Sequence, residues 1–422
     1  MDAFTYREEN GSRVLHAEGV SLTAVAAAFG TPTYCYANAV LVARYRALAG
    51  AAPHALIRYS IKANDTLAVI RTFARLGAGA DIISGGELHR ALRAGMAPDN
   101  LVFAGPAKSR DEMDLALASG VGQFNVESPA ELDALDEAAQ AQGTRAPVAL
   151  RVNPDVDADT HDKIATGRRG DKFGIDDGEI PALYARATAM DGIEPVGLAV
   201  HIGSQLTRLA PFEAAFDRLV ALVENLRAAG HAVERLGLGG GLGVRYRDET
   251  PPDVAAYGAL VERARQRLGV TMLIEPGRWL VAPAGLLLTR VIAVKQAGGR
   301  CWALVDAAMN DLMRPALYDA WHAIDPVAEP APDVDMVVTE VAGPVCESGD
   351  VLGRARQLPP LSPGDLLAVR DVGAYGSVMA STYNSRPLPA EVMVRGDALS
   401  SIRPRQDHES LLARDLAPSW LA

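Results

Sequence analysis

Apolar runs alternate with amphipathic stretches eight times between residues 55 and 275, and this pattern restricts the fold more than any other feature of the chain. The stretches between the runs have helical spacing, as at Leu67, Ile70 and Ala74. Strands that alternate with helices form parallel sheets, so a (β/α)8 barrel is predicted, with a doubly wound open sheet as the alternative. The eight predicted strands are Ala55–Ile61, Gly79–Ile83, Asn100–Ala104, Gly122–Val126, Pro147–Val152, Val196–Ile202, Val233–Leu238 and Thr271–Glu275.

The pattern changes after Pro276. Most apolar runs there are separated by Gly, Pro and Asp turns rather than by helices, which predicts a mainly antiparallel β domain with one helix at Asn310–His322. We therefore expect three parts: an N-terminal segment (1–30) that packs with the C-terminal domain, a barrel (31–280) and a β domain (281–422). The expected strands of the β domain are Leu286–Gln296, Cys301–Asp306, Met336–Ala342, Leu366–Asp371 and Glu391–Arg395.

Charge and cysteine content exclude several classes of protein. The 422 residues carry a net charge of −11 with no block rich in Lys or Arg, which disfavours nucleic acid and anionic membranes as partners but leaves a small anionic ligand open. No export segment and no membrane-spanning apolar run is visible. The three cysteines are widely spaced, which predicts no disulfide framework, no zinc site and a cytoplasmic location.

Chemically versatile residues follow several of the predicted barrel strands. Lys62 follows the first strand, Asp81 lies in the second, His201 ends the sixth, Gly239–Gly243 follows the seventh, and Glu275 ends the eighth. Because barrel enzymes place their active sites at the carboxyl ends of the strands, we expect these groups to lie on one face. The polar segment Asn153–Gly174 after the fifth strand is long enough to be a functional or mobile loop.

Lys62 is the strongest candidate for a reactive group. An average lysine is solvated, but one at the mouth of a barrel is partly desolvated, and its neutral amine can form a Schiff base with a carbonyl. The chain has few rivals, because three of the other lysines fall in polar loops and the fourth lies outside the barrel: Lys108, Lys163, Lys172 and Lys295.

The remaining groups are each ambiguous alone. The glycine run is either a tight turn or a phosphate site, the latter being common after strands seven and eight of this fold, with Ser204 as a further donor. Glu275 and Arg278 are either a surface ion pair or a half-buried carboxylate with a partner, and His201 is either a core histidine or a ring that stacks on a flat cofactor. Together these groups meet the requirements of pyridoxal 5′-phosphate.

With these motifs the sequence resembles the diaminopimelate decarboxylase family, within the alanine racemase-like (fold type III) group of pyridoxal-phosphate enzymes. The resemblance covers nearly the whole chain, although Ser60 stands where alanine is usual and Ala307-Ala308 where Ala-Gly is expected. The matching segments are Tyr59–Asn64, Asp171–Ile175, His201–Gln205, Gly239–Gly243, Glu275–Arg278, Met309–Tyr318, Gly343–Asp350 and Gly373–Gly376.

The resemblance implies a cofactor site, a substrate site and a homodimer with shared active sites. It implies that Lys62 bonds the cofactor aldehyde and that Cys346 protonates the carbanion after carbon dioxide leaves. The implied cofactor contacts are Lys62, His201, Ser204, Gly240, Gly241, Gly243, Glu275, Gly277, Arg278 and Tyr375. The implied substrate contacts are Arg278, Arg314, Tyr318, Glu347 and Tyr375, with Cys346 and Glu347 coming from the partner subunit.

The implied reaction converts meso-2,6-diaminopimelate to L-lysine and carbon dioxide, the last step of lysine biosynthesis. The residues suit this substrate, because guanidinium groups at Arg278 and Arg314 can bind its distal carboxylate and Glu347 its distal ammonium. Two alternatives remain: a non-catalytic carrier of the cofactor, which typically lacks a second domain, and a racemase, which needs no distal arginines.

Overall fold

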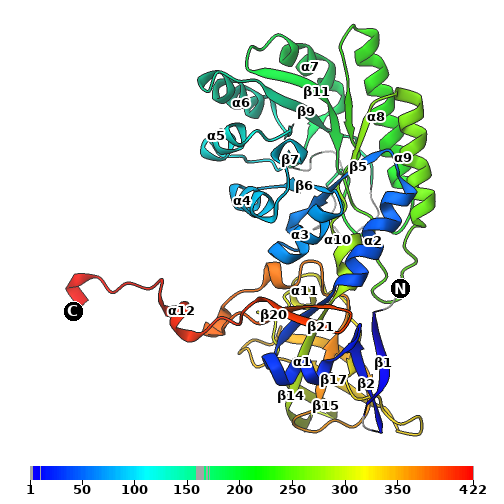
Figure 1. Ribbon diagram of the computed structural model, residues 1–422, viewed down its shortest axis with the longest axis vertical. Helices are drawn as coiled ribbons and strands as arrows, with labels where there is room; N and C mark the ends of the chain where they lie inside the picture. Colours follow the sequence, from blue (N-terminus) through cyan, green and yellow to red (C-terminus); the bar gives the residue numbers. More distant parts are fainter. Residues whose placement is uncertain (1–2, 10, 158–165, 168–169, 171, 422) are drawn as a thin grey trace. The chain divides into compact units, whose positions relative to one another are not determined.

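The computed structural model describes residues 3–9, 11–157, 166–167, 170 and 172–421. The chain divides into two compact units, one formed by residues 41–280 and the other by residues 1–40 together with 281–422. Figure 1 shows both units, coloured along the chain.

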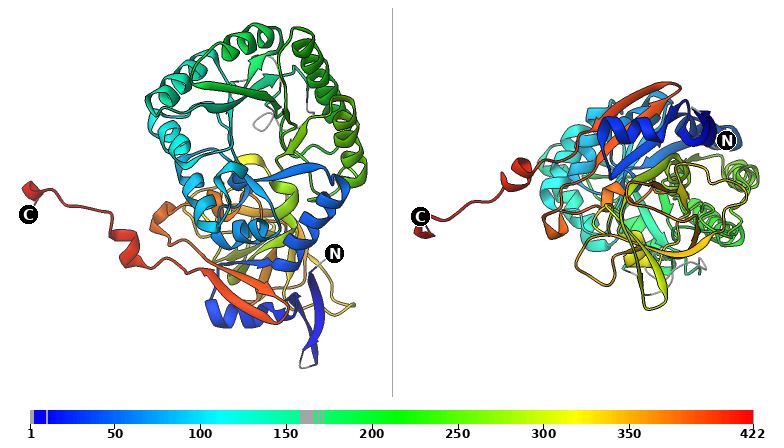
Figure 2. Two further views of the ribbon diagram at one scale, coloured as in Figure 1. Left: turned by 45° about the horizontal axis from the view of Figure 1, so that its top comes forward. Right: turned by 90° about the horizontal axis from the view of Figure 1, so that it is seen from below.

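The unit at 41–280 is a closed parallel barrel, which confirms the predicted (β/α)8 fold and its eight strands (Figure 2, left). Among the described residues the strands follow one another in the order β9-β11-β12-β13-β5-β6-β7-β8, and pairing of β8 with β9 closes the ring. A short strand, β10 (Ile175–Asp176), pairs with the outer part of β9. The barrel strands are β5 (Ala55–Ser60), β6 (Gly79–Ile82), β7 (Leu101–Phe103), β8 (Gln123–Val126), β9 (Ala146–Asn153), β11 (Ile193–Val200), β12 (Arg235–Gly237) and β13 (Thr271–Ile274).

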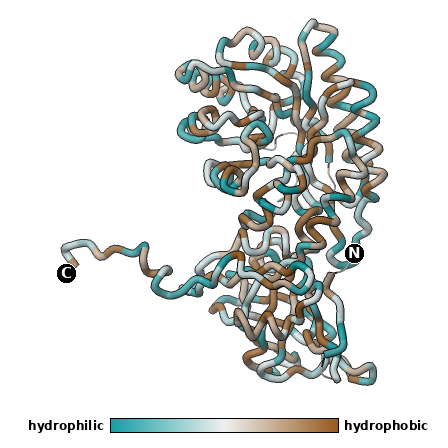
Figure 3. Tube along the Cα trace, in the orientation of Figure 1, coloured by the Kyte–Doolittle hydropathy of each residue, from teal (hydrophilic) through white to brown (hydrophobic). Residues whose placement is uncertain are grey.

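The helices of this unit begin and end at sequence signals. The side chains of Ser84, Ser109 and Ser128 each cap a helix by accepting the backbone N–H three residues later, and Gly95 and Gly120 end helices in the left-handed conformation. Figure 3 shows polar and apolar residues alternating along these helices. The helices are α2 (Asn38–Ala51), α3 (Leu67–Arg75), α4 (Gly85–Ala94), α5 (Arg110–Ser119), α6 (Pro129–Ala141), α7 (Ile180–Thr188), α8 (Ala210–Ala228), α9 (Val254–Leu268) and α10 (Arg278–Val281).

One of these helices, predicted from its apolar spacing, buries only part of that apolar set. Helix α3 buries Val69, Ile70 and Phe73, whereas Leu67 is exposed. The aromatic ring of Phe73 packs against Tyr59 and Tyr45, and this contact sets the orientation of the helix.

The other unit is a mixed, mostly antiparallel β structure. Its main sheet has the order β18-β17-β15-β14-β4-β20-β21, and β19 joins β14 to β16. A separate three-stranded sheet contains β1 to β3. The strands are β1 (Phe4–Glu9), β2 (Ser12–Ala17), β3 (Val20–Ser21), β4 (Thr33–Ala37), β14 (Gly285–Ala297), β15 (Arg300–Val305), β16 (Ile324–Pro326), β17 (Val337–Ala342), β18 (Val351–Leu358), β19 (Leu366–Val369), β20 (Ala390–Arg395) and β21 (Ala398–Arg403).

The strand β4 comes before the barrel in sequence and yet lies inside the main sheet of the other unit. It pairs antiparallel with β14 and parallel with β20. Its Tyr34 and Tyr36 rings are stacked, with centroids 6.2 Å apart, and both belong to the hydrophobic core of this unit. The core therefore joins chain segments from both sides of the barrel sequence.

The helix expected at Asn310–His322 is much shorter than predicted. Only α11 (Arg314–Tyr318) forms, because residues before it make a turn in which the Asp311 carboxylate accepts the Ala308 N–H, and Asp319 ends the helix with a φ of 50°. The remaining helices of this unit are α1 (Leu22–Phe29) and α12 (His408–Leu412). Across the part of the chain that the structure describes, no helix has the length and hydropathy needed to cross a membrane.

Candidate active site

Polar side chains gather at the carboxyl ends of the barrel strands, as predicted for this fold. Lys62 lies in the single 3-10 turn that follows β5, at Ile61–Ala63. Its ammonium lowers the pKa of Asp81, of Glu275 and of His201, which places it electrostatically close to all three. Lysine, histidine and two acids therefore share one end of the barrel.

Glu275 follows β13 and is 6% exposed. Burial and the nearby Asp81 raise the pKa of its carboxyl to about 8, against the opposing effect of Lys62, Arg151 and a hydrogen bond from Asn125. Its Oε1 atom is buried and has no hydrogen-bond partner among the described residues. A buried oxygen without a partner is costly, so this atom is suited to a ligand that forms a hydrogen bond with it.

His201 is held in a defined orientation by the glycine loop. Its Nδ1 accepts the Gly240 backbone N–H at 3.2 Å, which leaves Nε2 as the protonated nitrogen of the neutral ring. Burial lowers the pKa of His201 well below the ordinary value, and Lys62 and Arg151 lower it further. The imidazole is therefore neutral near pH 7 and presents a flat, uncharged ring.

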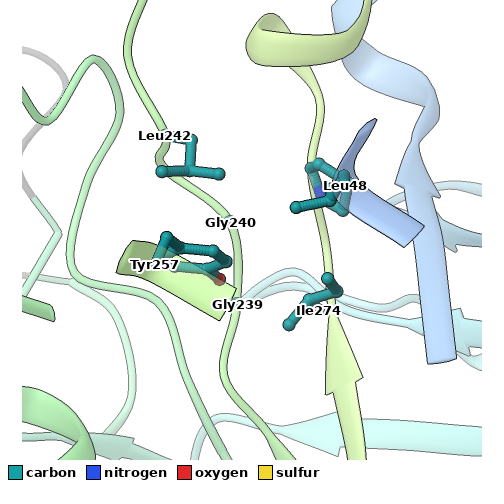
Figure 4. Close-up of a pocket in the computed structure, with 7 residues that line it drawn as sticks. Leu48, Gly239, Gly240, Leu242, Tyr257 and Ile274 are labelled. Atoms are coloured by element: carbon teal, nitrogen blue, oxygen red, sulfur yellow. The ribbon is translucent and has the colours of Figure 1, made fainter. Parts of the chain in front are cut away.

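The glycine loop passes so close to other backbone segments that side chains do not fit. A Cβ at Gly240 would lie 2.1 Å from the Glu275 carbonyl oxygen, and one at Gly241, where φ is 110°, would lie 2.5 Å from the Gly203 carbonyl oxygen. Backbone N–H groups in such a loop can approach an anion closely. A small apolar pocket beside the loop is lined by Leu48, Leu242, Tyr257 and Ile274 (Figure 4).

Arg278 begins α10 and is 7% exposed. Its Nε and Nη2 donate to the Ser204 hydroxyl at 3.3 and 3.1 Å, and its Nη1 donates to the Tyr246 hydroxyl at 2.8 Å. Of the two alternatives for Glu275 and Arg278, the structure favours the buried carboxylate, since a surface ion pair between them is not among the described ion pairs. Arg278 and Ser204 instead form one polar cluster next to the glycine loop, since Leu206 donates its N–H to the Gly241 carbonyl oxygen.

Comparison with known proteins decides the family. Residues 38–282 match the pyridoxal binding domain of the pyridoxal-dependent decarboxylases. The chain is 49% identical to a diaminopimelate decarboxylase from Pseudomonas aeruginosa, covering 98% of both chains, and 45% identical to one from Zymomonas mobilis, covering 98% of this chain and 99% of the other. The chain belongs to the diaminopimelate decarboxylase family.

Solved structures of this family share the fold. The crystal structure of the enzyme from M. jannaschii has a TM-score of 0.93 at 35% identity and covers 99% of both chains. The enzyme from Helicobacter pylori, crystallised with L-lysine, has a TM-score of 0.90 at 37% identity over 93% of this chain and 98% of that one. The predicted resemblance to the family is therefore confirmed.

The barrel residues fit the pyridoxal phosphate that the family model implies. Glu275 Oε1 is an acceptor without a partner for a protonated ring nitrogen, the Gly239–Gly243 loop offers backbone N–H groups for a phosphate, and neutral His201 offers a flat face. Gly277 adds a further close approach, since a Cβ there would lie 3.1 Å from the Cβ of Ser60.

Five predicted site residues belong to the other unit. Arg314 and Tyr318 stand at the two ends of α11, four residues apart and so on one helical face. Cys346 and Glu347 are exposed in the loop between β17 and β18; the Cys346 N–H donates to Asn384, and Glu347 accepts the hydroxyl of Tyr383, which raises the pKa of that tyrosine. Tyr375 has a φ of 56°, and strain of this kind clusters at functional sites.

The structure corrects the interpretation of Lys108 as a lysine of a polar loop. Its ammonium is buried and donates to Glu131 Oε1 at 2.6 Å and to the carbonyl oxygens of Gly105 and Asn125, both at 2.8 Å. All three N–H groups are thus used in structural bonds. Lys172 lies 5.1 Å from the Phe173 ring, Lys295 lies in β14, and Lys163 falls outside the described residues.

Sequence reasoning missed Arg151 and Asn125. Arg151 of β9 pairs with Glu127 at 2.7 Å, and it lowers the pKa of both His201 and Glu275. Each missed residue is a polar side chain inside an apolar strand run, and this placement is the signal in the sequence that could have identified it.

The expectation for the loop at 153–174 falls largely on residues outside the described ranges.

Proposed function

We propose that the barrel residues bind pyridoxal 5′-phosphate through Lys62 and use it to decarboxylate meso-2,6-diaminopimelate to L-lysine and carbon dioxide, the last step of lysine biosynthesis. The observation that carries this proposal is the pairing of a lysine at the barrel mouth with Glu275, whose buried Oε1 has no protein partner among the described residues. When bound, the cofactor supplies an electron sink for the bond that breaks.

The chain's own residues bind and orient the reactants. Lys62 would hold the cofactor, because its amine can bond the cofactor's aldehyde. Glu275 would hold a proton for the ring nitrogen, His201 would offer its neutral ring to the cofactor, and the loop at Gly240, Gly241 and Gly243 would bind phosphate together with Ser204, Gly277 and Arg278. A protonated ring nitrogen makes the sink stronger, which is why the Glu275 environment matters.

The substrate is recognised at its distal end. Arg278 and Arg314 bind the distal carboxylate through planar guanidinium groups, with Tyr318 and Tyr375 beside it, and Glu347 binds the distal ammonium. Cys346 is the proton donor to the carbanion, for which an exposed thiol is suited. Cys346 and Glu347 act in the active site of a partner subunit, so the working form is a homodimer. Its location is the cytoplasm, as the cysteine content predicts.

Borohydride trapping tests the assignment of Lys62. Purified protein is incubated with the cofactor and reduced, and the labelled peptide is identified by mass spectrometry. We expect the adduct on Lys62 and its complete loss in Lys62→Ala, while the matched control Lys172→Ala keeps it. An adduct on any other lysine would show that the assignment is wrong.

Product analysis tests the reaction. With meso-diaminopimelate we expect equal amounts of lysine and carbon dioxide. Cofactor binding without product would favour a carrier, and epimerised substrate would favour a racemase. Mixed dimers of Lys62→Ala and Cys346→Ala subunits should regain part of the activity, because one of the two sites then has both residues; no recovery in confirmed mixed dimers would contradict shared sites.

A further inference from the structure

Ser60 ends β5, two residues before Lys62. Its side chain is 4% exposed. The hydroxyl oxygen lies 2.5 Å from Asp81 Oδ2 and 3.3 Å from the Glu275 carbonyl oxygen, and the Ser60 N–H donates to the Pro276 carbonyl oxygen at 3.1 Å. An alanine would keep the backbone bond and lose both contacts of the hydroxyl.

A serine hydroxyl has one proton to donate, and the short distance assigns it to the Asp81 carboxylate. A hydrogen bond donated to a carboxylate favours its charged form. Asp81 is 3% exposed, and its other oxygen, Oδ1, has no hydrogen-bond partner among the described residues. Ser60 is therefore the hydrogen-bond donor that the structure records for this acid.

Asp81 and Glu275 are two buried carboxyls: burial raises the pKa of both, and the Asp81 charge raises that of Glu275 as well, so the pair retains a proton. Their donors differ: Asp81 has the Ser60 hydroxyl, and Glu275 has the amide of Asn125. Further charges surround the pair. Lys62 and Arg151 act on both acids, Glu87 and Glu127 interact with Asp81, and Arg58 interacts with Glu275.

We propose that Ser60 is a positioning residue that decides which of the two acids holds this proton: by donating to Asp81 Oδ2 it keeps Asp81 ionised and leaves the proton on Glu275. This inference rests on the proposed function, because Glu275 is the acid assigned there to the ring nitrogen. Glu275 would then be the acid able to supply this proton to the ring nitrogen of a bound cofactor.

Infrared difference spectroscopy of the full-length protein without cofactor reads the proton directly, through the carbonyl stretch of a protonated carboxyl near pH 7. In the wild-type background we expect Glu275→Gln to remove this band and Asp81→Asn to leave it. In the Ser60→Ala background we expect the band to move to Asp81, so that Asp81→Asn removes it. Loss of one charge-assisted hydrogen bond shifts the distribution between the acids by roughly tenfold or more.

Two controls separate proton placement from packing. Ser60→Thr keeps the hydroxyl and should keep the band on Glu275, whereas Ser119→Ala deletes a hydroxyl on α5 that donates to the Leu115 carbonyl oxygen and should change nothing. If Asp81→Asn removes the band in the wild-type background, or if Glu275 keeps it in Ser60→Ala, the inference is wrong. The comparison of Glu275→Gln with Asp81→Asn in the wild-type background shows which acid holds the proton even if Ser60→Ala fails to fold.

The loaded enzyme gives a second readout. We expect Ser60→Ala to lower kcat about tenfold with little change in KM, and Ser60→Thr to restore it. Because the infrared arm uses protein without cofactor, it reports on Ser60 whether or not the chain decarboxylates. Absence of lysine production by the wild-type enzyme would refute the proposed function and leave the infrared result standing.

Discussion

Buried acids of the two units have different hydrogen-bond environments. In the barrel unit, Asp81 Oδ1 and Glu275 Oε1 are buried and have no hydrogen-bond partner among the described residues. In the β unit, Asp350 accepts the Met309 N–H at 2.6 Å through one oxygen and the Val345 N–H at 2.7 Å through the other. The difference teaches that burial alone does not identify a functional acid. An unused oxygen points to a ligand only beside groups such as Lys62, since Glu340 of the β unit also has a buried Oε2 without a partner among the described residues.

The contrast extends to how each unit supports its predicted site residues. The barrel carries Lys62 and Glu275 directly after strands β5 and β13, where the sheet fixes their backbone. The β unit carries Cys346 and Arg314 on a loop and a five-residue helix, and Asp350 ties the two segments together. Asp350 therefore acts as a structural clamp, whereas Asp81 and Glu275 each keep an oxygen for a ligand.

The largest loss of stability is expected for a buried lysine of the barrel unit, Lys108, whose ammonium donates to three acceptors. Lys108→Met leaves Glu131 buried and uncompensated, and breaking a buried pair from one side costs about 4 kcal/mol. Denaturant unfolding measures this loss, and adduct trapping on Lys62 should survive in whatever fraction folds. A cost below about 1 kcal/mol would show that Lys108 does not act as a structural group.

Asp350→Ala tests the clamp of the β unit. It frees two backbone N–H groups that now donate to a carboxylate, with an expected loss of about 3 kcal/mol in the free energy of unfolding and a raised KM for substrate. The matched control is Asp335→Ala, an exposed aspartate in the same unit, which should change neither quantity. If Asp350→Ala leaves the free energy of unfolding unchanged, Asp350 is not a structural acid and the contrast with Asp81 and Glu275 fails.

A pH titration of unfolding tests the acid with the unused oxygen. The folded protein without cofactor holds the Glu275 proton up to about pH 8, whereas an unfolded glutamate releases it near pH 4.5. The folded state thus binds more protons in this window, and stability falls as pH rises through it, by about 1.4 kcal/mol per pH unit for one proton. Glu275→Gln should flatten this slope; an identical slope in the variant would contradict the assignment.

The smallest effect is expected for an exposed ion pair. Arg13 and Glu329 lie 2.7 Å apart with side chains 53% and 30% exposed, and such pairs contribute about 0.5 kcal/mol. Arg13→Ala should therefore leave the unfolding midpoint nearly unchanged at physiological salt. A loss of unfolding free energy as large as that of Asp350→Ala would show that the exposure of a charged side chain does not indicate how much it stabilises this chain.

The barrel could be predicted closely because its strands are buried on both faces and read as apolar runs bounded by turns. The β unit was harder. Strand β18 carries Arg354 and Arg356 among its residues and gives no apolar run, and β16 is only three residues long. The helix at Asn310–His322 was overestimated because Asp311 caps a turn and Asp319 takes a left-handed conformation, and neither can be seen in the periodicity.

Prediction of the site residues depended on whether a residue's position along a strand fixes its place in the fold. Residues that end barrel strands were visible because their position along the strand fixes their place in the fold. Arg151 was not, because its partners, Glu127 and the His201 carbonyl oxygen, come from other strands. Lys108 was misread for a related reason: its burial depends on Glu131, 23 residues away on α6. Which acid keeps an unused oxygen is a property of the assembled core and has no local sequence signal.

The place of β4 in the β unit has a consequence for synthesis of the chain. Tyr34 pairs with Leu287, about 250 residues later, so a ribosome needs on the order of tens of seconds to deliver the partner strand after β4 emerges. The whole barrel sequence is made in that interval and can fold while β4 still waits. The apolar segment Thr33–Ala37 is therefore a part of the nascent chain that needs protection from aggregation until β14 is made.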